Sequence, residues 1–134
     1  MAIVLLVEDN PVNAELARTV LERAGFEVRH AATASAALRL ARELQPAVIL
    51  MDLDLPDGDG LAVVRTLRVD GPLAATPIIA LTAHAMAGVE QAALEAGCSG
   101  YIAKPIDTRS FGAYVSSIAA ARKPSGGNQG GTGA

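Results

Sequence analysis

The chain has 134 residues, enough for one domain with a buried core, and its net charge of -3 argues against nucleic acid as a main partner. Apolar residues make up 51% of the sequence and aromatic residues only 3%, so the core is expected to be aliphatic. A single cysteine, Cys98, and the lack of any apolar run near the roughly 20 residues of a membrane span predict a cytoplasmic protein without disulfides or membrane contacts.

Five short apolar runs alternate with helical patterns along the chain. Four of them are continuous, as in strands that helices cover on both faces, and the second alternates in the way of a half-exposed edge strand. We expect strands at residues 3–7, 26–31, 47–51, 77–81 and 100–103.

Capping residues mark the helices between these strands. Asn10 and Thr33 are suited to cap the first two helices, and Gly25 and Gly97 to end the first and the fourth. The predicted helices cover residues 11–24, 34–44, 61–69, 85–96 and a last stretch from Asp107 or Thr108 to 121. The apolar stripe of the first helix is expected to be Leu16, Ala17, Val20, Leu21 and Ala24.

The last thirteen residues, 122–134, are rich in glycine, include one serine and have nothing to bury. We expect one domain at residues 1–121 and a flexible tail at 122–134. Alternation of strands and helices requires a parallel sheet with right-handed crossovers. Five such units match the flavodoxin-like, doubly wound (βα)5 fold, an α/β sandwich of three layers with strand order 2-1-3-4-5.

In this order the carboxyl ends of all strands lie along one edge, and polar residues follow four of them. Glu8 and Asp9 follow the first strand, Asp52 the third, Thr82 the fourth and Lys104 the fifth. Three close carboxylates repel one another unless a proton or a cation intervenes, and hard oxygen ligands suit Mg²⁺. Together with a hydroxyl and an ammonium group, they suit phosphoryl transfer, with the Asp52 carboxylate as nucleophile.

An acidic loop follows the third predicted strand. Asp54, Asp57 and Asp59 come after Asp52 and are mixed with Pro56 and two glycines. We expect Asp57 and Asp59 to belong to the turn and to the N-terminus of the third helix, where acids suit the helix dipole. The role of the Asp54 side chain stays open.

Four stretches together resemble the receiver domain of two-component response regulators, in its single-domain, chemotaxis-regulator-like form. They are LLVEDN, ILMDLDLPDGDG, ALTAHAM and GYIAKPI, which stand in this order, each at the end of a predicted strand. The resemblance covers residues 2–121.

The resemblance implies a role for each matching residue. Asp52 would be the phosphoacceptor, and Glu8 and Asp9 the acidic pair that binds Mg²⁺ with it. The main-chain carbonyl of Asp54 would be a further ligand of the metal. Thr82 would be the switch hydroxyl, and Lys104 would pair with the phosphoryl group.

The family also implies Tyr101 as the switch aromatic residue and a cis peptide bond between Lys104 and Pro105. A histidine kinase or a histidine phosphotransfer protein would donate the phosphoryl group. Phosphorylation would remodel the surface of the fourth helix, the fifth strand and the last helix, where a downstream protein would bind. Such a domain is a monomer or a weak dimer and no enzyme, apart from self-catalysed phosphotransfer and autodephosphorylation.

Other classes share part of this pattern and remain alternatives. A haloacid-dehalogenase-type phosphohydrolase also uses Asp-x-Asp after a strand, as at Asp52 and Asp54, but places it on the first strand. A flavodoxin-like electron carrier needs a Ser/Thr/Gly-rich phosphate loop where this chain has Glu8-Asp9-Asn10. A receiver domain excised from a hybrid histidine kinase is the third alternative.

Overall fold

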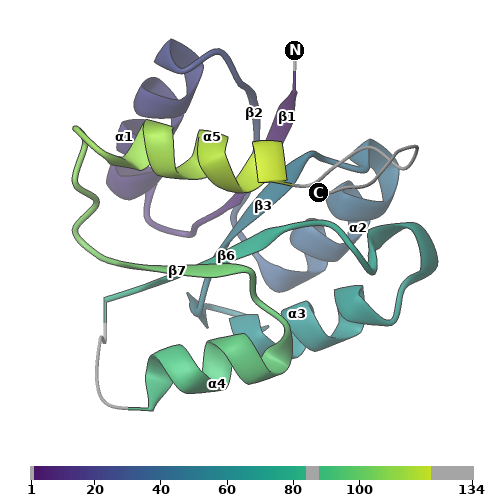
Figure 1. Ribbon diagram of the computed structural model, residues 1–134. Helices are drawn as coiled ribbons and strands as arrows, with labels where there is room; N and C mark the ends of the chain where they lie inside the picture. Colours follow the sequence, from purple (N-terminus) through teal and green to yellow (C-terminus); the bar gives the residue numbers. More distant parts are fainter. Residues whose placement is uncertain (1, 84–87, 122–134) are drawn as a thin grey trace.

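Five parallel strands form the central sheet in the computed structural model, which describes residues 2–83 and 88–121 (Figure 1). They are β1 (Ile3–Val7), β2 (Glu27–Ala31), β3 (Val48–Asp52), β6 (Ile78–Thr82) and β7 (Gly100–Ala103). Their spatial order is β2-β1-β3-β6-β7, and every neighbouring pair is parallel. The predicted doubly wound arrangement is therefore confirmed, including the edge position of the second strand.

Helices cover both faces of this sheet, which gives the molecule three layers (Figure 1). Two of them contact each other on one face: α1 (Pro11–Arg23) and α5 (Phe111–Ala121). The other face carries α2 (Ala34–Leu44), α3 (Gly60–Arg68) and α4 (Val89–Ala96). Because side chains alternate along a strand, Val4 and Leu6 join the core under the first pair, while Leu5 and Val7 join the core under the other three helices.

The predicted helix caps are present. The Asn10 side chain accepts hydrogen bonds from the main-chain N–H groups of Val12 and Asn13, at 2.9 and 3.1 Å. Thr33 caps α2 by accepting from the Ala36 N–H at 3.1 Å. Gly25 takes the left-handed conformation expected after a helix, with φ of 98°.

Leu16 was placed in the apolar stripe of the first helix, but it is 40% exposed. The buried residues of α1 are Ala14, Ala17 and Leu21. One residue corresponds to about 100° around a helix, so Leu16 lies beside this stripe and toward solvent. The small residue Ala14 faces the sheet instead.

The last helix begins later than expected, and short elements form on both sides of α3. The last helix begins at Phe111, after a turn in which the Asp107 side chain accepts from the Arg109 N–H at 3.0 Å. A short antiparallel hairpin, β4 (Asp54–Leu55) and β5 (Gly58–Asp59), forms in the acidic loop, and the helical turn η1 (Gly71–Leu73) follows α3. The predicted start of the fourth helix at 85 and the predicted tail at 122–134 lie outside the described residues.

The end of α3 is fastened to its neighbours by Arg68. Its guanidinium group donates to the carbonyl oxygens of Gly97, Ala74 and Thr76, at 2.8, 3.1 and 2.6 Å. Cys98 is buried beside it as expected, and burial raises the pKa of its thiol to about 11.

Within the described part of the chain, no helix is both long enough and apolar enough to cross a membrane.

Candidate functional site

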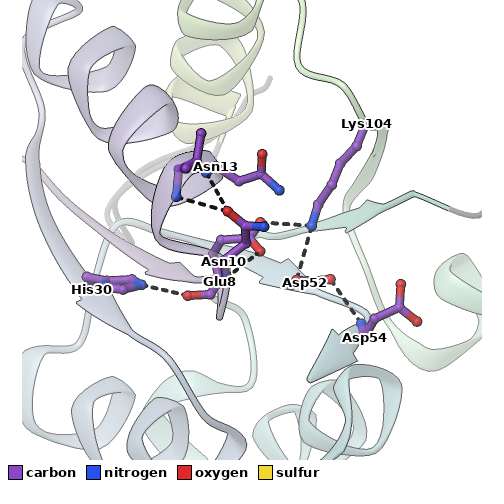
Figure 2. Close-up of polar contacts among 8 residues, drawn as sticks. Glu8, Asn10, Asn13, His30, Asp52, Asp54 and Lys104 are labelled. Carbon is purple, nitrogen blue, oxygen red and sulfur yellow. Dashed lines mark hydrogen bonds and ion pairs between the residues drawn. The ribbon is translucent and has the colours of Figure 1, made fainter. Parts of the chain in front are cut away.

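The parallel sheet brings the predicted site residues together at its carboxyl edge. Glu8 follows β1, Asp52 ends β3, Thr82 ends β6 and Lys104 follows β7. Figure 2 shows the side chains of Glu8, Asp52 and Lys104 converging on one point. The side chains of Glu8, Asp52 and Thr82 lie in the interior, since these residues are at most 2% exposed. Such burial of acids requires partners, because an isolated buried charge is costly.

Lys104 is the partner of both buried carboxylates. Its Nζ atom lies 2.8 Å from Oε1 of Glu8 and 3.1 Å from Oδ2 of Asp52 (Figure 2). Burial acts to lower the pKa of Lys104, but the hydrogen bonds to Glu8 and Asp52 outweigh it, so the pKa is raised and the ammonium is retained. Burial raises the pKa of Glu8, and the hydrogen bond from Lys104 reverses this only in part. One cation thus faces two carboxylates, which leaves the site with surplus negative charge.

The third acid, Asp9, is exposed and stands at the rim of the site. One carboxylate oxygen each from Glu8, Asp9 and Asp52 lies within 4.8 Å of the others. Mg²⁺ binds hard oxygen ligands, keeps several waters and is commonly held by one or two carboxylates. The donor set and the surplus negative charge therefore fit a Mg²⁺ ion on the solvent side of Asp52.

Asp54 is attached to the site through its main chain. Its N–H donates to Oδ1 of Asp52 at 2.9 Å, so the carboxylate of Asp52 is held on one side by this bond and on the other by Lys104 (Figure 2). Asp54 then begins β4, which pairs with β5. The side chain of Asp54 itself is exposed.

Thr82 and Lys104 are joined through the backbone. The main-chain N–H of Lys104 donates to the carbonyl oxygen of Thr82 at 2.7 Å, next to a cis peptide bond between Lys104 and Pro105, as expected. Tyr101 lies three residues before Lys104 on the edge strand and is half-buried against the core under α2, α3 and α4. The Tyr101 N–H donates to the hydroxyl of Tyr114 at 3.4 Å.

Asp57 lies in the predicted turn, but its side chain caps a helix other than α3. The sequence assigned Asp57 and Asp59 to the turn and to the start of the third helix, and Asp59 does cap α3 by accepting from the Leu61 N–H at 3.0 Å. Asp57 instead reaches the N-terminus of α2, where it accepts from the main-chain N–H of Ala34 at 2.7 Å. The β4–β5 hairpin turns Asp57 away from α3, and no local sequence signal reports this.

A further contact was not foreseen at His30 on β2. Its Nε2 atom lies 2.6 Å from the main-chain oxygen of Glu8 (Figure 2). The two residues are 22 positions apart and meet because β1 and β2 are neighbours in register, with Leu6 opposite His30. Only the strand pairing reveals this contact.

Comparison with known proteins agrees with this geometry. The profile of the response regulator receiver domain matches residues 4–116. The chain is 44% identical over 108 residues to the polar-differentiation response regulator DivK of Brucella anthropi, a match that spans 81% of this chain and 88% of that protein.

Two solved structures have the same fold. One is the receiver domain of a sensor histidine kinase from Pseudomonas aeruginosa, described with a magnesium ion coordinated in its active-site cleft; it is 35% identical, with a TM-score of 0.82 over 89% of this chain and 98% of that chain. The other is the chemotaxis response regulator CheY4 of Vibrio cholerae, 28% identical, with a TM-score of 0.82 over 88% of this chain and 98% of that chain.

These matches favour the receiver over a phosphohydrolase or a flavin-binding electron carrier. The family match covers the strand ends at Glu8, Asp52, Thr82 and Lys104, which the structure brings to one edge. The chain therefore belongs to the receiver domains of two-component response regulators, the signalling domains of phosphorelays.

Proposed function

We propose that this receiver accepts a phosphoryl group on the carboxylate of Asp52. The observation that carries the proposal is the position of this carboxylate, which is buried at the sheet edge between Lys104 and the N–H of Asp54. Both contacts orient its oxygens, and a fixed nucleophile lowers the entropic part of the barrier to in-line attack. The donor would be the phosphohistidine of a histidine kinase or of a histidine phosphotransfer protein.

In the proposed transfer an oxygen of Asp52 forms the new P–O bond while the P–N bond to the donor histidine breaks, and the imidazole takes up a proton. Mg²⁺, when bound, neutralises charge on the phosphoryl oxygens. Asp9 and Asp52 would hold it directly, with the main-chain carbonyl of Asp54, and Glu8 would act through water. Lys104 would exchange its bond to Asp52 for one to a phosphoryl oxygen.

The first test uses acetyl phosphate with Mg²⁺ as a small donor and intact-mass spectrometry as the measurement. We expect wild type to gain one phosphoryl group and Asp52→Asn to gain none. Asp59→Asn is a matched control, because it also replaces an acid of the same loop and asparagine caps a helix as well as aspartate does. Transfer to the Asp52→Asn variant, or no transfer to wild type, would refute the assignment.

The proposed switch couples Asp52 to the outer surface through Thr82 and Tyr101. A phosphoryl group on Asp52 would draw the hydroxyl of buried Thr82 toward its oxygens, and Tyr101 would move into the space that Thr82 leaves. Tyr101 stands on the edge strand and lines a cavity of about 300 Å³ with Phe111 and Tyr114 of α5. This local event would remodel the surface of α4, β7 and α5 for a downstream protein.

The switch is tested with beryllofluoride and Mg²⁺, which mimic the phosphoryl group, by following amide resonances in NMR spectra. We expect shifts near Asp52 and also along β7 around Tyr101 in wild type. In Thr82→Ala the shifts near Asp52 should remain and those around Tyr101 should be lost. Equal shifts around Tyr101 in both proteins would contradict a role for the Thr82 hydroxyl.

We also propose the wider setting of this reaction. The domain would comprise residues 1–121, and α5 ends at the last of these, Ala121. The partner kinase would contact α1 next to the site, where the apolar side chains of Val12 and Leu16 are 75% and 40% exposed.

A free, buried thiol at Cys98 is consistent with a protein that works in the cytoplasm. Self-catalysed phosphotransfer and autodephosphorylation would be its only chemistry, and a monomer or weak dimer its working form.

A further inference from the structure

The β4–β5 hairpin lies directly beside the phosphorylation site. It begins at Asp54, two residues after Asp52, and its strands pair Asp54 with Asp59 and Leu55 with Gly58. This register leaves Pro56 and Asp57 at the tip of the hairpin. The orientation of β4, and with it the main-chain carbonyl of Asp54, therefore depends on how both ends of the hairpin are held.

The base of the hairpin is held by the site itself and by the core. The Asp54 N–H donates to Oδ1 of Asp52 at 2.9 Å, and the side chain of Leu55 is buried among the residues under α2 and α3. A two-stranded ribbon of this size is not stable in isolation. Further contacts at the tip are needed to keep it in one orientation.

Asp57 provides such contacts at the tip. Its Oδ1 accepts from the Ala34 N–H at 2.7 Å, and its Oδ2 accepts from the N–H and the hydroxyl of Ser35 at 3.3 and 2.9 Å. The hydrogen bond from Ala34 is the main cause of a lowered pKa of Asp57, so the carboxylate is charged at neutral pH. All three bonds join the tip to the first turn of α2, 22 or 23 residues away in sequence.

α2 has a cap of its own and does not depend on Asp57 alone. Thr33 accepts from the Ala36 N–H at 3.1 Å, and its main-chain oxygen accepts from the Ala37 N–H at 3.0 Å. Asp57 satisfies the two remaining N–H groups of the first turn, those of Ala34 and Ser35. The two capping residues thus serve one helix, but only Asp57 belongs to the hairpin.

We propose that Asp57 is a positioning residue of the phosphorylation site: by fixing the hairpin tip to α2, it holds the main-chain carbonyl of Asp54 in the direction in which that carbonyl would bind Mg²⁺. This inference rests on the proposed function. A ligand atom that is already in place loses less freedom when the metal binds, so the metal binds more tightly. Asp57 does not touch the reacting atoms and acts through the hairpin.

The test compares Asp57→Ala, Asp57→Asn and Thr33→Ala. Thr33→Ala is the matched control, because it weakens the start of α2 without releasing the hairpin. In Asp57→Ala we expect the dissociation constant for Mg²⁺, measured by calorimetry, to rise about tenfold, as is typical when a residue that supports metal ligands is lost. Asp57→Asn keeps an oxygen that can accept from the Ala34 N–H, and it should restore most of the affinity. Thr33→Ala should bind Mg²⁺ as wild type does.

A second readout does not involve the metal. In metal-free protein, the amides of residues 54–59 should exchange hydrogen faster in Asp57→Ala than in wild type and in Thr33→Ala. If Asp57→Ala and Asp57→Asn bind Mg²⁺ equally weakly, and the amides of residues 54–59 do not exchange faster, the inference is overturned. Loss of a nearby negative charge would then explain the weaker binding. Wild-type affinity in Asp57→Ala would overturn it as well. If wild type itself binds no Mg²⁺, the proposed function fails, which is a separate and distinguishable result.

Discussion

Replacing Lys104 by methionine is expected to lower the free energy of unfolding of the metal-free protein by about 3 kcal/mol, the range seen when one partner of a buried ion pair is removed. Glu8 and Asp52, both at most 2% exposed, would then face each other without the ammonium that lies 2.8 and 3.1 Å from them. The side chain of Lys104 is itself only 13% exposed, so water screens this interaction little.

Magnesium provides the decisive comparison for Lys104→Met. A divalent cation beside Asp52 replaces part of the lost positive charge, so Mg²⁺ should stabilise this variant more than it stabilises wild type. Urea unfolding followed by circular dichroism measures the stability of wild type and of the variant, with and without Mg²⁺, since the chain contains no tryptophan for fluorescence. A variant as stable as wild type without metal would show that the ammonium is not needed to keep the two carboxylates in the interior.

The control for this experiment is Arg109→Met, which removes a cation from the surface near the same end of the sheet. The side chain of Arg109 is 92% exposed and lies 3.7 Å from Asp107. Exposed ion pairs contribute little, so we expect its stability to change by no more than about 0.5 kcal/mol. The difference between the two variants isolates the effect of burial.

The second large effect is expected at Gly60, the first residue of α3. A Cβ atom at this position would meet the carbonyl oxygen of Asp52 and would lie 2.8 Å from Cα of Leu53. Both neighbours belong to the main chain and cannot rotate away. We expect Gly60→Ala to cost about 3 kcal/mol, the upper part of the usual range for overpacking. This is a large share of the roughly 5–15 kcal/mol that stabilises a typical domain.

Gly60→Ala should also disturb the site, because the clash is with the residue that carries the proposed phosphoacceptor. We expect slower transfer from acetyl phosphate at a temperature where the variant is still folded. Gly71→Ala is the control, since nothing lies within 4 Å of a Cβ built there, and it should change stability by less than about 0.5 kcal/mol. Similar unfolding midpoints for both variants would show that the backbone near Asp52 can shift to admit the methyl group.

The strand and helix order could be predicted from the sequence because each element carries its own local signal. Continuous apolar runs predicted four of the five strands, and caps such as Asn10 and Thr33 predicted where helices begin. Once the order of elements is known, the handedness of the crossovers restricts the sheet to few topologies. The convergence of Glu8, Asp52, Thr82 and Lys104 at one edge follows from that topology, since all parallel strands end on the same side.

The contacts between distant residues could be decided only by the tertiary structure. Three such contacts join residues that are at least 22 positions apart. They are the hydrogen bonds between Asp57 and α2, the contact of His30 with Glu8 and the ion pairs of Lys104 with two acids. Local patterns carry no information about such distances. The outward position of Leu16 likewise depends on how α1 lies on the sheet. A residue at the margin of an apolar helix face can point toward the sheet or toward solvent, and the sequence pattern does not say which.

The fold, the edge at which the site lies and the chemical types of its residues follow from the sequence alone, because these depend on local patterning and on strand order. The folded structure is needed to know which acid faces which cation, how far Asp52 is buried and which helix Asp57 caps. Burial, pKa and hydrogen-bond geometry are properties of side chains packed from several elements at once, and packing exists only after the chain has folded.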